Sequence, residues 1–168
     1  VRSHAVDRDD AVVREALEAS GLAANRLEIE ITESVLLQDT QATRACLHQL
    51  REMGVRISLD DFGTGYSSLS YLHAFPLDKV KIDRSFLEGV ATSSRPLNLL
   101  YAVARLSAEL GMSVAAEGIE TQEQLALLAR EPAVEEVQGF LIGAAMPSAE
   151  IRKMLVTPGA QFGRARLS

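Results

Sequence analysis

The chain has 168 residues, 47% hydrophobic and 24% charged, a balance typical of one soluble globular domain, and no apolar stretch reaches the length of a membrane span. Its net charge is −6 and its Lys and Arg residues are scattered, which excludes the basic stripe that duplex nucleic acid requires. The single cysteine, Cys46, excludes an internal disulfide and a zinc site of paired cysteines, so we expect a cytoplasmic protein with no membrane contact from this segment.

Helices and strands are predicted to alternate along the chain. Residues 9–20 place apolar side chains on one helical face, and Gly21 ends this helix. Residues 27–32 alternate aliphatic and acidic side chains, as a strand does. Further strands are predicted at 55–59, 79–83, 113–116 and 134–138, and further helices at about 40–53, 67–72, 97–110, 122–130 and 148–155. This order predicts parallel βαβ units, either in a doubly wound sheet or in part of a barrel.

Polar residues recur in or at the end of the predicted strands, namely Glu30, Asp60, Asp61, Lys81, Glu117 and Gln138. The carboxyl ends of parallel strands meet at one edge, which is where such folds bind ligands. Four carboxylates there would repel one another without a cation, and oxygen ligands suit Mg²⁺ or Mn²⁺. Such a metal polarises phosphoryl oxygens, and a lysine can stabilise the charge that develops. The alternative is that each acid is only a solvated residue at a strand end or helix cap.

Five motifs in order resemble the second half of EAL-domain cyclic di-GMP phosphodiesterases. They are EIEITES at 28–34, LDDFGTGYSSLSYL at 59–72, KVKIDRSF at 79–86, AAEGIET at 115–121 and QGF at 138–140. The resemblance covers residues 10–156 and implies an α/β fold, a TIM-like (β/α)8 barrel of the EAL type that lacks its N-terminal strands in this chain. Residues 1–156 are therefore predicted to be a partial EAL domain, and residues 157–168 a frayed C-terminal tail.

The same resemblance implies roles for individual residues. The metal ligands implied by the matching motifs are Glu30, Asp60 and Asp61, and two Mg²⁺ or Mn²⁺ ions are expected in the complete domain. The catalytic residues implied are Lys81, Glu117 and Gln138. Glu33 and Glu120 resemble the acids that, in this family, support the loop after Asp61 and the neighbouring site. The implied reaction is hydrolysis of cyclic di-GMP, a bacterial second messenger, to linear pGpG.

The motif that gives the family its name, Glu-x-Leu-x-Arg on a strand, is missing, as is the Asn-bearing strand that follows it. Glu15, Ala16 and Leu17 spell the name, but they lie in a predicted helix and Ala19 stands where Arg is required. Because a (β/α)8 barrel typically has about 250 residues, the chain is expected to be a fragment of a complete enzyme. A shortened protein that has lost catalysis is the alternative.

Three functions follow from these patterns. The leading one is an enzyme, because the recognisable acids after the name motif are all present. The second is an inactive receptor that binds cyclic di-GMP, and the third is a protein-interaction module that uses neither nucleotide nor metal. Since an incomplete barrel exposes strand edges and apolar surface, we also expect a homo-oligomer or contacts with further domains of a parent protein.

Overall fold

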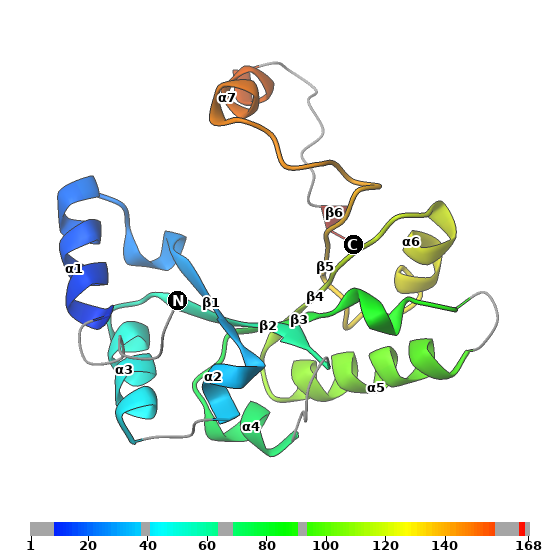
Figure 1. The fold of residues 1–168 in the computed structure, drawn as a ribbon, viewed down its shortest axis with the longest axis horizontal. Coiled ribbons are helices and arrows are strands. Elements are labelled where there is room, and N and C mark those ends of the chain that lie inside the picture. Colours follow the sequence, from blue (N-terminus) through cyan, green and yellow to red (C-terminus); the bar gives the residue numbers. More distant parts are fainter. Residues whose placement is uncertain (1–8, 38–40, 64–68, 91–93, 157–164, 167–168) are drawn as a thin grey trace.

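The computed structural model describes residues 9–37, 41–63, 69–90, 94–156 and 165–166. The strands within these ranges form one six-stranded sheet in the order β1-β2-β3-β4-β5-β6. The first five strands are parallel, and β6 is antiparallel to β5. The described sheet is open rather than closed into a ring (Figure 1). The strands are β1 (Glu28–Thr32), β2 (Arg56–Phe62), β3 (Lys79–Ile82), β4 (Ser113–Ala116), β5 (Glu136–Val137) and β6 (Ala165–Arg166). The predicted succession of parallel strands is therefore confirmed.

Helices occupy the connections between the parallel strands, and α2, α3, α4 and α5 lie on one side of the sheet (Figure 1). The α-helices are α1 (Asp9–Ser20), α2 (Glu33–Leu37), α3 (Gln41–Glu52), α4 (Leu69–Ala74), α5 (Arg95–Glu109), α6 (Gln122–Leu128) and α7 (Ser148–Val156). Two 3-10 turns, η1 (Ala24–Arg26) and η2 (Arg84–Phe86), complete the described elements. None of the described helices is both long and apolar enough to cross a bilayer.

The hydrophobic core lies between these helices and one face of the sheet. Alternate strand residues point to opposite faces, so the buried residues Ile57, Leu59, Val80, Ile82 and Val114 share the face that packs against helices. Full burial of one such side chain contributes roughly 1.5–3 kcal/mol to folding. The alternate strand residues consequently lie on the other face, among them Lys81, which the sequence singled out.

Several element bounds differ from the sequence-based expectations. Helix α2 follows β1 directly and was not predicted, and β2 continues through Asp60 and Asp61, which were expected just beyond its end. The extension arises because Phe62 still pairs with Ile82 of β3. Strand β6 lies in the segment expected to be a tail. Residues 38–40 and 64–68, which include expected helix starts, lie outside the described residues.

Candidate metal centre

Strand β2 ends in an irregularity that carries Asp60 and Asp61. The pairing register between β2 and β3 shifts between Leu59 and Phe62, and Asp61 has a φ of 54°, in the left-handed region. Asp and Asn tolerate this conformation better than most residues because their short polar side chains can hydrogen-bond locally. Carboxylate oxygens of Asp60, Asp61 and Glu117 all lie within 4.8 Å of one another.

Glu117 follows β4 and brings the third carboxylate. Its backbone N–H donates to the carbonyl oxygen of Ile82, 3.0 Å away, which extends the pairing of β4 with β3. The side-chain oxygen Oε1 is buried and lies 2.7 Å from Nζ of Lys81, which is its partner among the described residues. Burial, and secondarily the negative charges of Asp60 and Asp61, raise the pKa of Glu117 above its ordinary value, although Lys81 opposes this. The site is thus one in which a further positive charge would be stabilised.

Lys81 provides the positive charge that this structure places among the acids. It lies in β3 and is largely buried, and its Nζ is 2.7 Å from Oδ1 of Asp60, 2.7 Å from Oε1 of Glu117 and 2.9 Å from Oε1 of Glu30. All three contacts are ion pairs at hydrogen-bonding distance, and the ammonium donates to each carboxylate. Burial alone would lower the pKa of Lys81, but the hydrogen bonds and charges of the carboxylates outweigh it and raise the pKa. Lys81 therefore stays protonated at neutral pH.

The donor set fits a hard divalent cation. Asp60 and Asp61 offer carboxylate oxygens from the end of β2, and Glu117 offers one from the segment directly after β4. Mg²⁺ or Mn²⁺ completes its shell with water or phosphate oxygens when a protein supplies only a few ligands. The sequence placed Glu30 in the ligand set and Glu117 in the catalytic set. In the structure, Glu117 joins the two aspartates, and Glu30 pairs with Lys81.

The other residues singled out in the sequence lie around this group. Gln138 follows β5, is exposed, and lines a hollow together with Lys81. Glu33 is buried at the start of α2. Glu120 is exposed, and its N–H donates to Oε1 of Gln124 at 2.8 Å. The loop at 64–68 that Glu33 and Glu120 are expected to support lies outside the described residues.

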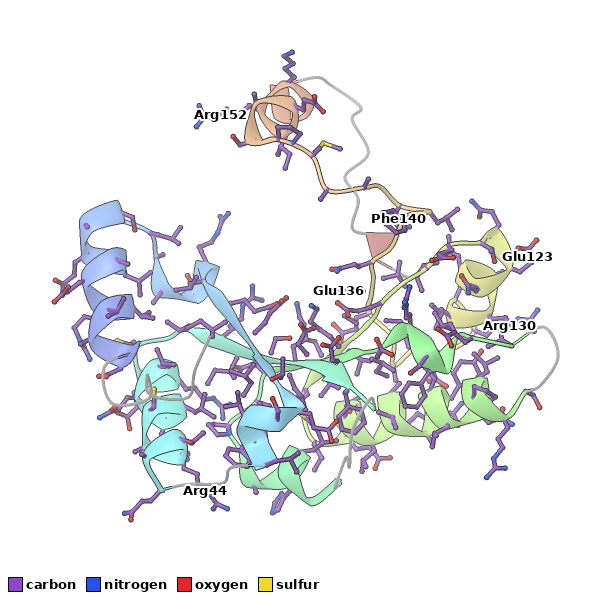
Figure 2. All side chains as sticks on the ribbon, in the orientation of Figure 1. Arg44, Glu123, Arg130, Glu136, Phe140 and Arg152 are labelled. Carbon is purple, nitrogen blue, oxygen red and sulfur yellow. The ribbon has the colours of Figure 1, made fainter. Side chains whose placement is uncertain are left out.

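A second charged group on the same face was not predicted. Lys79 is 3% exposed, and its Nζ lies 3.0 Å from both Oε1 and Oε2 of Glu28 and 3.1 Å from Oε2 of Glu136. Glu136, labelled in Figure 2, comes from β5 and lines the same hollow as Gln138. The sequence did contain a signal for this group, because polar residues two apart share one face of a strand. The pairs are Glu28 with Glu30, Lys79 with Lys81, and Glu136 with Gln138.

A parallel sheet that gathers three carboxylates and a lysine at its carboxyl edge defines an α/β domain with an oxygen-rich site suited to a divalent cation. Residues 10–145 match the family model of the EAL domain, and the chain belongs to this family. Solved EAL domains are TIM-like barrels, and the parallel sheet and helices described for this chain match them at TM-scores of 0.80 and 0.83. The predicted family and fold class are thereby confirmed.

Three relatives are especially informative. Cyclic di-GMP phosphodiesterase NbdA of Pseudomonas aeruginosa is 47% identical over 143 residues, which are 85% of this chain and 18% of that protein. The EAL domain of Mycobacterium smegmatis DcpA has a TM-score of 0.83 and 36% identity, over 90% of this chain and 68% of that one. BlrP1 of Klebsiella pneumoniae, solved with manganese and cyclic di-GMP, has a TM-score of 0.72 and 34% identity, over 78% of this chain and 33% of that one. The chain spans only 17–20% of the curated relatives' length.

Proposed function

We propose that the chain provides the site for metal-dependent hydrolysis of cyclic di-GMP to linear pGpG. The observation that carries this proposal is the group formed by Asp60, Asp61 and Glu117 with Lys81 beside it. Phosphodiester hydrolysis needs positive charge near the phosphoryl oxygens and an activated water, and this group suits both needs. The naming of NbdA as a cyclic di-GMP phosphodiesterase, and the manganese and cyclic di-GMP bound to BlrP1, support the same substrate and metal class.

Each residue has a distinct part in the proposed reaction. Asp60, Asp61 and Glu117 would hold Mg²⁺ or Mn²⁺, which when bound polarises a phosphoryl oxygen and lowers the pKa of water. The Lys81 ammonium keeps its proton, so it would orient the attacking water or donate to a phosphoryl oxygen as charge develops. Gln138, exposed beside Lys81 in the hollow, would donate from its amide to the substrate.

The remaining predicted roles belong to the same proposal. Glu30 would act as a further ligand, since its carboxylate contacts the ammonium that also contacts Asp60 and Glu117. Glu33 and Glu120 would support the loop after Asp61. A cytoplasmic location follows from the proposed substrate, which is an intracellular messenger. A homo-oligomer, or contacts with further domains of a parent protein, would cover the open edge of β1.

The deciding experiment measures pGpG formation by chromatography with Mg²⁺, with Mn²⁺ and with a chelator. The wild-type chain is compared with Asp60→Asn and with Glu123→Gln, a matched loss of one negative charge at an exposed position of α6 outside the hollow. Turnover that requires metal, disappears in Asp60→Asn and persists in Glu123→Gln supports the proposal. If the chain binds cyclic di-GMP without forming product, the same assay on a chain extended upstream by about 80 residues, enough to complete a barrel, decides between two interpretations: product there favours a fragment of an enzyme, and none favours a receptor. Neither binding nor product favours a protein-interaction module.

A further inference from the structure

The 3-10 turn η2 lies between the two chain segments that carry the carboxylates. Asp83, which caps η2, donates its backbone N–H to the carbonyl oxygen of Phe62 at 3.4 Å. One residue earlier, the carbonyl oxygen of Ile82 accepts from the N–H of Glu117 at 3.0 Å. The start of η2 is therefore tied to the end of β2 on one side and to Glu117 on the other.

A direct packing contact joins η2 to the segment after Asp61. Phe86 is 9% exposed, and its ring lies so close to Gly63 that a Cβ added there would stand 2.0 Å from Phe86 Cε2 and 2.4 Å from Cζ. Gly63 also has a φ of 103°, a conformation open to glycine. The ring thus rests on the backbone two residues beyond Asp61, where the chain leaves the strained end of β2.

A matching contact joins the same turn to the segment after Glu117. A Cβ added at Gly118 would stand 2.3 Å from Cβ of Arg84, with Cδ and Cγ of Arg84 at 3.2 and 3.3 Å. Gly118 has a φ of 70°. The aliphatic stem of Arg84 therefore lies across the backbone next to Glu117, although Arg84 as a whole is exposed.

We propose that η2 is a positioning element that sets the spacing between Asp61 and Glu117, with Phe86 and Arg84 as its two contact residues. Like charges confined within 4.8 Å repel one another, and packing against η2 adds to the restraint that the ion pairs of Lys81 with Asp60 and Glu117 provide. Phe86 restrains one segment and Arg84 the other, and both belong to one short turn. Neither residue touches the reacting atoms. The inference rests on the metal site proposed above and adds the element that keeps its ligands at binding distance.

The test measures Mn²⁺ affinity from the spin-resonance signal of free Mn²⁺, and separately the free energy of unfolding without metal. Phe86→Leu keeps an apolar side chain but removes the ring from Gly63, so Mn²⁺ affinity should fall about tenfold, as for other residues behind metal ligands. The matched control is Phe75→Leu. Phe75 is a buried residue that directly follows α4, and its ring contacts the guanidinium of Arg44. This substitution should lower stability comparably while leaving Mn²⁺ affinity within about twofold, since core truncations act on folding.

A second pair of variants keeps the test decisive should Phe86→Leu fail to fold. Arg84→Ala keeps Cβ but removes Cγ and Cδ, the outer part of the stem that lies over Gly118, and should weaken Mn²⁺ binding about threefold. Arg84→Lys keeps these methylene groups and should retain wild-type affinity. If both Phe86→Leu and Arg84→Ala bind Mn²⁺ as tightly as the wild type does, the inference about η2 is wrong, while the proposed metal site stands. A wild-type chain that binds no Mn²⁺ overturns the proposed metal site as well. Mn²⁺ binding that responds as expected, without pGpG formation, leaves the inference standing and rejects hydrolysis.

Discussion

Nζ of Lys81 lies 2.7 Å from Oδ1 of Asp60, and the lysine places its positive charge among the carboxylates that would hold a divalent metal. The same ammonium contacts Glu30 and Glu117. Without metal, Lys81 is therefore the group that neutralises the acidic edge of the sheet. A bound metal would bring a second positive charge to the same carboxylates, and the two cations would repel each other.

Replacing Lys81 by Met should separate its structural role from its proposed role in hydrolysis. The change leaves the half-buried carboxylates of Asp60 and Glu117 without their partner, which should cost less in the free energy of unfolding than the roughly 3–5 kcal/mol typical of a fully buried pair. Mn²⁺ should bind the variant more tightly than it binds the wild type, because the competing ammonium is gone. Turnover should be lost despite this tighter binding. Denaturant unfolding with and without Mn²⁺, together with a pGpG assay, measures all three effects.

Lys79→Met is the matched control for this prediction. Lys79 is also buried in β3 and is paired with two acids, Glu28 and Glu136. Its loss should destabilise the fold by a similar amount but leave Mn²⁺ affinity within about twofold of wild type, since it contacts none of the three clustered carboxylates. Equal Mn²⁺ affinity in Lys81→Met and wild type would show that the ammonium and the metal do not compete.

Asp61 is a proposed metal ligand and also has a left-handed backbone conformation, and two substitutions separate the effects of these two properties. Asp61→Asn keeps a side chain that tolerates a φ of 54° and should change the free energy of unfolding by less than about 0.5 kcal/mol while weakening Mn²⁺ binding. Asp61→Ala should weaken Mn²⁺ binding and also cost about 1–2 kcal/mol of stability, the ordinary penalty of this conformation. Thermal unfolding and Mn²⁺ titration measure both changes. Undiminished Mn²⁺ binding by Asp61→Asn contradicts a ligand role.

The sequence predicted the parallel strands and placed the acids at their carboxyl ends, because side-chain alternation and strand-end position are local properties. The resemblance implied that Asp60 and Asp61 share a metal site, but strand periodicity alone does not show how they converge, since consecutive strand residues point to opposite faces unless a register shift intervenes. The shift depends on how β2 pairs with β3, and such tertiary pairing is not encoded in either strand alone. The same limit explains why Glu117, and not Glu30, emerges as the third clustered carboxylate in the described residues.

Asp83 should stabilise η2 as an ionised cap. Its side chain accepts from the N–H of Ser85 at 2.9 Å, and although burial opposes ionisation, the hydrogen bonds from Ser85 and Arg84 lower the pKa of Asp83 below 3.8. A carboxyl whose pKa is lowered by folding contributes its stability above the unfolded value and loses it as the pH falls through the folded value. Asp83→Ala should therefore cost about 1 kcal/mol at neutral pH. Denaturant unfolding from pH 7 downward should show this difference shrinking below the unfolded pKa of 3.8, and a constant difference would contradict the ionised cap.

Gly139 allows the segment after β5 to pack closely against the segment after β4 at Ile119, and its replacement should separate the two segments. A Cβ at Gly139 would stand 2.2 Å from N and 2.3 Å from O of Ile119, and these backbone atoms cannot move aside as a side chain would. The same atoms hydrogen-bond to Gln138 and Leu141, at 3.1 and 3.0 Å. Gly139→Ala should therefore cost about 1–3 kcal/mol, as overpacking does, and displace Gln138 from the site.

Gly143→Ala is the internal comparison for that change, because a Cβ at Gly143 meets nothing within 4 Å. Its effect on the free energy of unfolding should stay within about 0.5 kcal/mol, as for most surface substitutions. The midpoint of thermal unfolding in the two variants measures the difference, and the affinity for cyclic di-GMP reports on Gln138. If the two variants unfold at the same temperature, the close approach of Gly139 to Ile119 does not constrain this edge, and the position of Gln138 must depend on other contacts.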